Sequence, residues 1–473
     1  MKLFIKRAIS VLITICLFIV ILHKNIEITK RKDSVARNND FFELDEDYDV
    51  LFFGSSHVMN GIFPMELWND YGIISWNFGG AANRIPTSYW IMMNAFDYTE
   101  PEIVVIDIFN LSLEEKYKTT TKNLHDALDV FLLSETKINA VKDLIDDESL
   151  RAEYLFDYVT YHNRWNALEK SDFKESSYNT KGAIIKEDIV APKAMEITDK
   201  VLQEESVNMV YLKKMIGECQ NRDIEVVLTC LPFGAEEFRY EEANTAQKIA
   251  EEYDVPYINF LVMDGVVDYS VDFADESGHL NSSGAIKVTD YIGNYLLENY
   301  ELSDKRNVTD YSSWNDDYDS YLREKINNIK RQTELDSYLM LMNDDSFSSI
   351  IEIENISILE EQNIRNLLIG LELDLPRIDN ATIVVCDTKN ANVEYFYGMK
   401  ESFEENETSL GALKYISKNQ SIRLRLNDNT CWYIDEGAEN DYDIRIAVVD
   451  NRTGLEVDNI SFTIGEEKIK HYN

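Results

Sequence analysis

The sequence has few cysteines and a shortage of positive charge. Its 473 residues include five cysteines, which show neither a metal-ligand spacing nor a dense disulfide framework, so we expect buried thiols. Lys and Arg total 46 against 86 Asp and Glu, which gives a formal charge of −40. Such a surface repels phosphate backbones, so nucleic acid is not expected as a partner.

A long apolar run occurs at the N-terminus. Residues 8–22, extended by residues 3–5, approach the roughly 20 residues that span a bilayer. No small-x-small site follows the run, which favours an uncleaved anchor over a cleaved signal peptide. Because Lys and Arg flank the run on both sides, charge alone does not fix its orientation. We expect one N-terminal transmembrane helix with a short stalk.

Short apolar runs alternate with amphipathic segments between residues 45 and 300. This order predicts an α/β fold, a three-layer α/β/α arrangement with a parallel sheet covered on both faces. From about residue 111 to 205 the chain is helical, acidic and aromatic, which indicates a helical insertion, either a lid over the carboxyl edge or a passive appendage. Strands are expected at 49–53, 73–78, 103–109, 224–231 and 256–260, with helices at 64–70, 87–96, 207–219, 243–253 and 283–299.

The C-terminal third has a different pattern. Several short β-type runs separated by polar turns suggest a β-sandwich-like domain, and residues 451–454 resemble a hairpin turn. The runs are 350–353, 367–373, 382–386, 393–397, 422–426, 444–449 and 460–464. The expected organisation is an anchor and stalk over 1–32, an α/β domain over 33–300, a helical linker over 301–340 and a β-rich accessory domain over 341–473.

Polar residues follow the expected strands. Parallel strands bring such loops to one edge of a sheet, where open α/β folds bind their ligands. The positions are Gly54-Ser55-Ser56-His57 after the first strand, the turn Gly79–Asn83 after the second, Asn110 after the third, and Asp275, Glu276 and His279 after the last.

Ser56 is the candidate nucleophile. A serine needs a base within hydrogen-bond reach, a third group that orients the base, and donors for the oxyanion. His279 is the candidate base, and Glu276 or Asp275 is the candidate acid that holds its imidazole. The competing interpretation is that Ser56 merely caps a helix, a common use of serine after a strand.

The order of these motifs resembles the SGNH (GDSL) hydrolase superfamily over about residues 45–300. The segment Gly54–His57 resembles its Gly-x-Ser motif, with Ser55 in place of the usual Asp, and His279-Leu280-Asn281 resembles its late histidine loop. Asn110 stands roughly where the family has its third motif, but the neighbouring Gly and Asp of that motif are absent. By the family's register the acid is Glu276, three residues before the histidine; Asp275, four residues before it, stays open.

The resemblance also implies donors for an oxyanion. These are the backbone N–H of Ser56, the turn at Gly79 to Ala82, and the side chain of Asn110. Ala82 takes the place of the family's glycine. A backbone N–H survives that change provided that the turn does not need a positive φ there.

The layout is most similar to the membrane-anchored envelope branch of this superfamily, which includes the D-alanyl transfer protein of teichoic acids and the alginate O-acetylation proteins. Such proteins carry one N-terminal helix and an external SGNH domain, and they commonly work beside a multi-span membrane O-acyltransferase. The resemblance implies a single-pass cell-membrane protein that transfers or hydrolyses acyl esters of an envelope glycan. A non-catalytic assembly or glycan-binding protein on the same fold is the alternative.

Three further residues are candidates for substrate binding. His57 either contacts substrate or caps the turn that follows it. Arg164 and Trp165 belong to a cluster, Tyr161–Trp165, that would stack on a sugar ring or pack a helix against its neighbour. No metal is expected, because carboxylates such as Asp443 and Asp450 lack EF-hand-like spacing. No cofactor is implied.

Overall fold

The computed structural model describes most of the chain, and its contacts divide the chain into two compact units. The first unit contains residues 1–184, 195–263 and 292–312, and the second contains 185–194, 264–291 and 313–473. The described residues are 2–30, 36–43, 46–117, 121–173, 180–193, 197–234, 237–380, 382–397, 404–418, 421–427, 429–434 and 442–472. The four-part division expected from the sequence stays a prediction.

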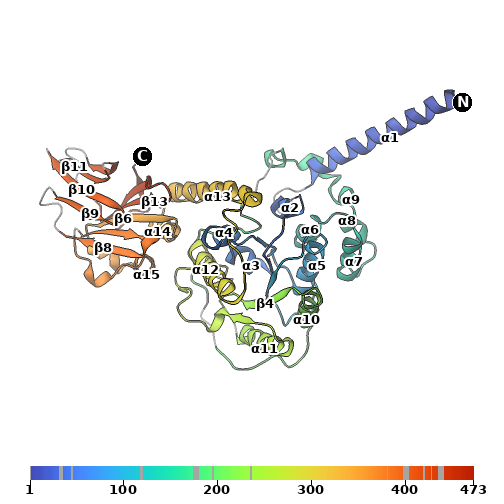
Figure 1. Cartoon of the computed structure of the whole chain (residues 1–473), viewed down its shortest axis with the longest axis horizontal. Coiled ribbons are helices and arrows are strands. Elements are labelled where there is room, and N and C mark those ends of the chain that lie inside the picture. The colour runs from blue at the N-terminus through green and yellow to red at the C-terminus, as the bar shows by residue number, and fades with distance from the viewer. Residues whose placement is uncertain are drawn as a thin grey trace. The chain divides into compact units, whose positions relative to one another are not determined.

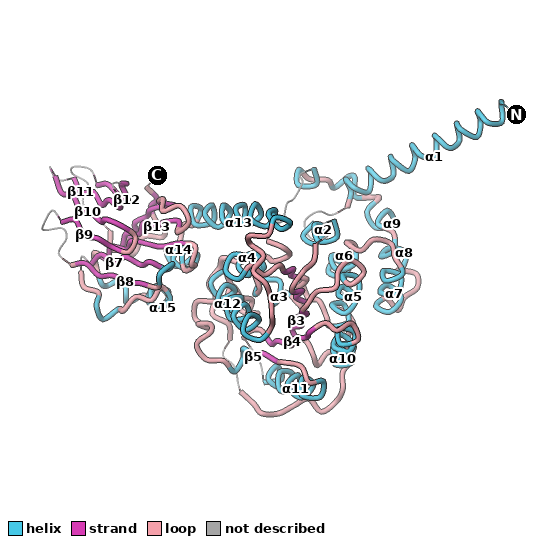
Figure 2. The backbone as a smooth tube through the Cα atoms, viewed as in Figure 1, coloured by secondary structure: helices cyan, strands magenta, loops and turns pink. Residues whose placement is uncertain are grey.

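A five-stranded parallel sheet forms the centre of the first unit (Figure 2). All residues of its three strands β1, β2 and β3 are buried, and successive residues of a strand face opposite sides, so these strands are covered on both faces. The α/β class with a parallel sheet is therefore confirmed. The strand order is β2-β1-β3-β4-β5, with β1 at Val50–Phe53, β2 at Ser75–Asn77, β3 at Ile103–Asp107, β4 at Glu225–Cys230 and β5 at Tyr257–Asn259.

The helices next to this sheet form close to their expected positions. Helix α4 begins with Pro64, whose fixed φ and missing N–H suit the first turn of a helix. Helix α11 begins at Glu237, earlier than expected, and α3 was not expected at all. The helices are α3 (Ser56–Gly61), α4 (Pro64–Tyr71), α5 (Ile85–Ala95), α10 (Val207–Gln220), α11 (Glu237–Tyr253) and α12 (Ser282–Asn299), of which residues 282–291 are grouped with the second unit. Helix α2 (Ala36–Glu43) precedes them, and the 3-10 turns η3 (Phe260–Val262) and η4 (Thr309–Tyr311) also belong to the first unit.

Helix α1, Lys2–Thr29, is the long N-terminal helix of the first unit (Figure 1). Its segment Phe4–Ile26 is long and apolar enough to cross a membrane, and none of its most apolar window is buried inside the protein. The expectation of one N-terminal helix able to span a bilayer is confirmed by length and composition.

The expected insertion is helical only in its first part. Among the described residues, helices and 3-10 turns follow one another up to Phe173, whereas 180–193 and 197–205 form neither helix nor strand. Residues 185–194 are grouped with the second unit. The elements are α6 (Thr121–Leu128), α7 (Glu135–Leu144), α8 (Arg151–Leu155), α9 (Asp157–Tyr161), η1 (Arg164–Ala167) and η2 (Lys170–Phe173).

Two antiparallel sheets dominate the second unit. A six-stranded sheet has the order β15-β14-β13-β6-β7-β8, and a four-stranded sheet has the order β12-β11-β10-β9. The hairpin predicted at 451–454 joins β13 to β14. The strands are β6 (Phe347–Ile353), β7 (Thr382–Asp387), β8 (Asn392–Phe396), β9 (Glu404–Thr408), β10 (Gly411–Lys418), β11 (Ser421–Leu426), β12 (Asn429–Ile434), β13 (Ile444–Asp450), β14 (Glu456–Phe462) and β15 (Lys470–His471).

The central strands β6, β7 and β13 of the six-stranded sheet are buried on both faces. Ile350, Ile383 and Val385 on one face pack with Leu413 and Leu426 of the four-stranded sheet, which makes the expected sandwich-like pair. The opposite face forms a larger core with side chains from the helices of this unit. These helices are α13 (Ser312–Arg331), α14 (Leu335–Met342) and α15 (Gln362–Gly370), with the short 3-10 turns η5 (Ile356–Glu360), η6 (Leu375–Arg377) and η7 (Thr388–Asn390) between elements.

The strand predicted at 367–373 is wrong, because this segment contributes to helix α15. Its buried residues Ile364, Leu367, Leu368 and Leu371 recur at helical spacing, and Ile369 is half exposed. Leucine is also a better helix former than the β-branched residues of the neighbouring strands. The apolar residues of this run were therefore part of a helical pattern and did not indicate a strand.

Two glycines allow close packing beside the end of β1, Gly54 against side chains and Gly79 against the backbone of α3. A Cβ built on Gly54 would lie 2.4 Å from Val58 Cγ2 and 2.9 Å from Asp107 Cβ, and a Cβ on Gly79 would lie 2.3 Å from the backbone nitrogen of Met59. Helix α3 thus sits directly on the segment that follows β2. Any larger residue at position 79 must displace the backbone of α3.

We expect Gly79→Ala to lower the free energy of unfolding by about 1–3 kcal/mol, the usual cost of overpacking. Gly217→Ala is the matched control, because Gly217 lies inside α10 with no neighbouring atom within 4 Å of a built Cβ. That change is expected to add up to about 1 kcal/mol of stability through helix propensity. Thermal denaturation of the full chain in detergent checks the two opposite shifts, and midpoints that move together would contradict the packing argument.

Candidate active site

The strand order places a topological switch point at the carboxyl ends of β1 and β3. In a 2-1-3-4-5 sheet the order of the chain reverses between these two strands, and open α/β sheets bind ligands at such a switch point. Ser55, Ser56 and His57 follow β1, and Asn110 follows β3. The His57 ring lies 4.0 Å from the Phe109 ring, between centroids, so the two loops are in contact.

Ser55, and not Ser56, caps helix α3. Ser55 has extended backbone angles, and its Oγ accepts a hydrogen bond from the His57 N–H at 3.3 Å. Ser56 is the first residue of the helix and is half-buried. The capping role that competed with the nucleophile interpretation therefore belongs to its neighbour.

His57 is packed among aromatic rings. Its side chain is buried, its Nδ1 lies 3.2 Å from Ser55 Oγ, and its ring also approaches Phe233 with 5.3 Å between centroids. These contacts hold the start of α3 against the segments that follow β3 and β4. A direct role of His57 in substrate binding stays a prediction.

Three backbone N–H groups of the turn after β2 already donate hydrogen bonds within the protein. The Gly79 N–H donates to Asn77 Oδ1 at 2.8 Å, the Gly80 N–H to Gly54 O at 3.2 Å, and the Asn83 N–H to Gly80 O at 3.1 Å. The N–H of Ala82 has no acceptor among the described residues. Of the two donors predicted here, Gly79 is thus engaged and Ala82 is available.

Ala82 adopts a left-handed backbone conformation. From the sequence we accepted alanine here only on the assumption that the turn does not need a positive φ, and that assumption was wrong. Its φ is +56°, and it occupies the third position of the turn closed by the Asn83 N–H. A positive φ at this position of a β-turn normally calls for Gly or Asn. The turn does need a positive φ where the sequence has alanine.

Asn110 also has a positive φ, +72°, which asparagine tolerates. Its Oδ1 lies 3.3 Å from Arg239 Nη1. Because a guanidinium only donates, the amide oxygen must face Arg239 and the NH₂ group must face the other way. Arg239 therefore sets the direction in which Asn110 donates.

Arg239 is itself anchored by a buried carboxylate. Glu242 is 0% exposed, accepts from Arg239 Nη1 at 2.7 Å and accepts from the Ser112 N–H at 2.8 Å. Sequence reasoning missed both residues, because they lie on α11, far along the chain from Asn110. The available signal was an Arg and a Glu three residues apart on an amphipathic helix, a pattern too common to single out.

Asp107 terminates β3 as a buried carboxyl group. Its two oxygens accept hydrogen bonds from the Leu231 N–H at 3.1 Å and the Phe109 N–H at 3.2 Å. Complete burial outweighs these bonds and raises the pKa of Asp107 to about 7. The carboxyl group fixes where the chain leaves β3 and β4, just before Asn110.

The second unit contains the predicted histidine loop. His279 Nδ1 lies 2.9 Å and 3.0 Å from the two carboxylate oxygens of Asp275, and Lys186 Nζ lies 2.8 Å from Asp275 Oδ2. A carboxylate only accepts, so Nδ1 carries the hydrogen and Nε2 is the basic nitrogen of the ring. Glu276 is exposed, and Asp275 is the carboxylate in contact with His279.

The charge of Asp275 is well defined. Partial burial opposes ionisation, but hydrogen bonds from Lys186 and His279 outweigh it and lower the pKa of Asp275 to about 2. Asp275 is therefore a carboxylate at any physiological pH. Lys186 was missed from the sequence because it lies in the segment 185–194, 89 residues before Asp275.

The residues around the loop hold its shape. The Ala274 N–H donates to His279 O at 2.8 Å, and Gly278 between them has a φ of +81°. Asn281 donates from Nδ2 to Val271 O at 2.7 Å, and its Oδ1 accepts from the N–H of Gly284 at 3.2 Å in the first turn of α12. The His-Leu-Asn motif thus combines a partly buried histidine paired with Asp275 and an asparagine that anchors the loop.

Arg164 and Trp165 belong to η1, which packs against α1. Arg164 Nη1 donates to the Thr29 carbonyl oxygen at 2.8 Å, and Nη2 pairs with Asp172 at 2.7 Å. The Trp165 side chain is 65% exposed. Their assignment to substrate binding stays a prediction.

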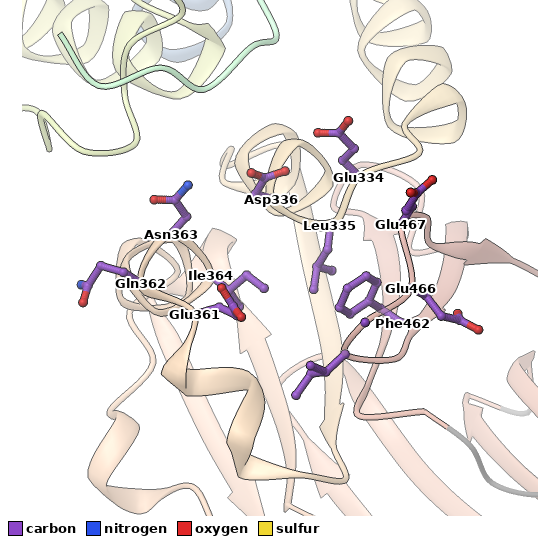
Figure 3. Close-up of a pocket in the computed structure, with 12 residues that line it drawn as sticks. Glu334, Leu335, Asp336, Glu361, Gln362, Asn363, Ile364, Phe462, Glu466 and Glu467 are labelled. Atoms are coloured by element: carbon purple, nitrogen blue, oxygen red, sulfur yellow. The ribbon is translucent and has the colours of Figure 1, made fainter.

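A pocket of the second unit has none of the residues predicted for the site in its lining (Figure 3). Acidic side chains surround an apolar floor that includes Leu335, Phe462 and Ile464. The acidic residues are Glu334, Asp336, Glu361, Glu466 and Glu467. The pocket has no serine, cysteine or histidine in its lining, so it offers no nucleophile and base.

Comparison with known proteins gives a distant structural likeness. No family model matches the chain, and no curated protein matches it. Solved structures that match include a candidate lipolytic protein of the G-D-S-L family from Desulfitobacterium hafniense DCB-2, at 12% identity and a TM-score of 0.27. The match covers 52% of this chain and 97% of that one. Likeness at this level leaves the activity to be argued from the residues themselves.

We expect Ala82→Gly to stabilise the protein by about 1 kcal/mol, because glycine removes the steric cost of a left-handed backbone. Ala81→Gly is the matched control in the same turn, where φ is not positive, and it should be neutral or destabilising through chain entropy. Thermal midpoints of the full chain in detergent check the difference. Equal shifts for the two variants would show that Ala82 carries no strain.

Proposed function

We propose that the protein is a serine-dependent esterase or O-acyltransferase. Ser56 of the first unit is the nucleophile, and the His279–Asp275 pair of the second unit supplies the base and its orienting acid. The observation that carries this proposal is the double hydrogen-bond contact between His279 Nδ1 and the Asp275 carboxylate. With Nδ1 donating to the carboxylate, Nε2 is the nitrogen that would accept the serine proton, as in a Ser-His-Asp triad.

The reaction follows from these roles. Ser56 Oγ attacks the ester carbonyl while His279 Nε2 takes its proton, and Asp275 stabilises the imidazolium that forms. The tetrahedral intermediate collapses, His279 returns the proton to the departing alcohol, and an acyl-serine remains. Water as the second acceptor completes hydrolysis, and a sugar hydroxyl completes transfer. The Ser56 N–H, the Ala82 N–H and the Asn110 amide are the proposed oxyanion donors.

The proposed setting is the cell membrane, with α1 as a single-pass anchor and both units outside the cell. The proposed substrate is an acyl ester of an envelope glycan, and a membrane-bound O-acyltransferase is the proposed partner. The apolar segment Phe4–Ile26 supports the membrane anchor. The strongly acidic composition argues against nucleic acid as a partner. The orientation, the glycan substrate and the O-acyltransferase partner are proposed from the resemblance of the sequence to the membrane-anchored envelope branch of the SGNH superfamily.

A non-catalytic role in envelope assembly or glycan binding is the second candidate. The observation that favours it is the state of the turn after β2, where the Gly79 N–H is already bonded and Ala82 has a positive φ. An oxyanion hole with one donor fewer loses roughly 100- to 1000-fold in rate. The labelling experiment below separates the two functions.

We expect a fluorophosphonate probe to label the full chain in detergent at Ser56, because an activated serine attacks the phosphorus as it would attack an ester. Ser56→Ala should abolish labelling, and His279→Gln should slow it at least 100-fold. Ser149→Ala and His162→Gln, both at exposed positions of the insertion, should label like the wild type. A folded wild type that stays unlabelled would favour the binding protein, and labelling that survives Ser56→Ala would identify another serine.

The two candidate acids are separated by a matched pair of amide variants. Asp275→Asn should slow labelling by about 100- to 10,000-fold, because the amide no longer stabilises the imidazolium or fixes its tautomer. Glu276→Gln should change the rate less than about 2-fold, because Glu276 is exposed. Rates of fluorophosphonate labelling measure both. The reverse result would make Glu276 the acid.

A further inference from the structure

The insertion exposes a group of large apolar side chains, here called the interfacial patch. Buried packing normally covers such residues, and a soluble surface rarely gathers several of them in one short segment. Each has between 42% and 66% of its side chain exposed, and two of them are aromatic residues at 65%. The patch comprises Leu132, Leu133, Phe156, Tyr158, Val159, Trp165 and Phe173.

The elements that carry this patch contact the end of α1. Arg164 Nη1 donates to Thr29 O at 2.8 Å, and Lys30 Nζ pairs with Asp157 at 2.9 Å. Lys30 Nζ also donates to the Asp129 carbonyl oxygen at 2.5 Å, three residues before Leu132. Helix α9 and both 3-10 turns, η1 and η2, pack against α1 within the same unit (Figure 1).

These contacts fix the depth of the patch relative to a bilayer. The apolar span ends at Ile26, and Thr29 lies three residues further, a helical rise of about 4.5 Å. The headgroup layer on each side of the hydrocarbon core is about 5–7 Å thick. If the apolar span fills the hydrocarbon core, groups bonded to Thr29 and Lys30 lie at the depth of the headgroup layer.

We propose that the interfacial patch inserts into the headgroup–acyl boundary of the leaflet from which the C-terminal end of α1 emerges. The patch and α1 then form one continuous membrane contact. Trp, Tyr and Phe are the residues that favour this depth, because their rings are apolar while Trp and Tyr keep one polar group near water. With a formal charge of −40, apolar burial and not attraction to anionic lipid holds the patch in place.

Trp165 reports the depth directly. The chain has six tryptophans, of which Trp68, Trp76 and Trp314 are buried and Trp90 donates to Asp143 at 2.7 Å. The full chain is reconstituted in phosphatidylcholine nanodiscs whose acyl chains are either plain or brominated near the headgroup. Bromine quenches indole emission on contact, so the emission should be lower in the brominated discs.

We expect Trp165→Phe to abolish this difference between the two kinds of disc, whereas Trp90→Phe should preserve it. Leu132→Ser with Leu133→Ser should reduce the quenching at least 2-fold by weakening insertion of the patch. Leu297→Ser is the control, at a 41% exposed position of α12. Equal emission in both discs, or quenching that persists in Trp165→Phe, would overturn the proposal and leave a protein partner as the occupant.

Discussion

The close approach of backbones beside the end of β1 is the constraint on which the site of the first unit depends. Gly54 and Gly79 lack the Cβ that would collide with Val58 and with the backbone of Met59. Only then can α3 start immediately after β1, with Ser55 as its cap and Ser56 in its first turn. The same approach lets the Gly80 N–H bond to Gly54 O, so the segment after β2 is tied to the segment after β1.

Charged side chains then set the directions of the polar groups. Glu242 holds Arg239, and Arg239 holds the amide oxygen of Asn110, so a fully buried carboxylate on α11 orients a donor at the end of β3. In the second unit Lys186 and Asp275 play the equivalent part for the imidazole of His279. In each unit, an Arg or Lys remote in sequence contacts a residue of a predicted motif, Arg239 at Asn110 and Lys186 at Asp275.

Local patterns predicted the parallel sheet, the N-terminal helix and most strands of the second unit, because strands buried on both faces leave short continuous apolar runs in the sequence. They failed at α15, where Leu367 and Leu371 fit either period, and at α3, which is too short for periodicity to detect. The sequence left two adjacent candidates, Asp275 and Glu276, for the carboxylate that contacts His279. The choice of Asp275 depends on loop geometry, with Gly278 in a left-handed conformation, which side-chain spacing does not encode.

The bonds from Lys30 and Arg164 have a mechanical consequence. A flexible stalk would let a tethered domain sweep a volume that grows with its length, and it would meet substrates at many heights. Here Arg164 and Asp157 contact Thr29 and Lys30, about one helical turn beyond the apolar span. The insertion is therefore held next to the span without a flexible linker between them. Under the proposed function, an acyl ester carried on a polymer would have to come close to the bilayer surface to react, and the local concentration of membrane-held reactants would govern how often they meet.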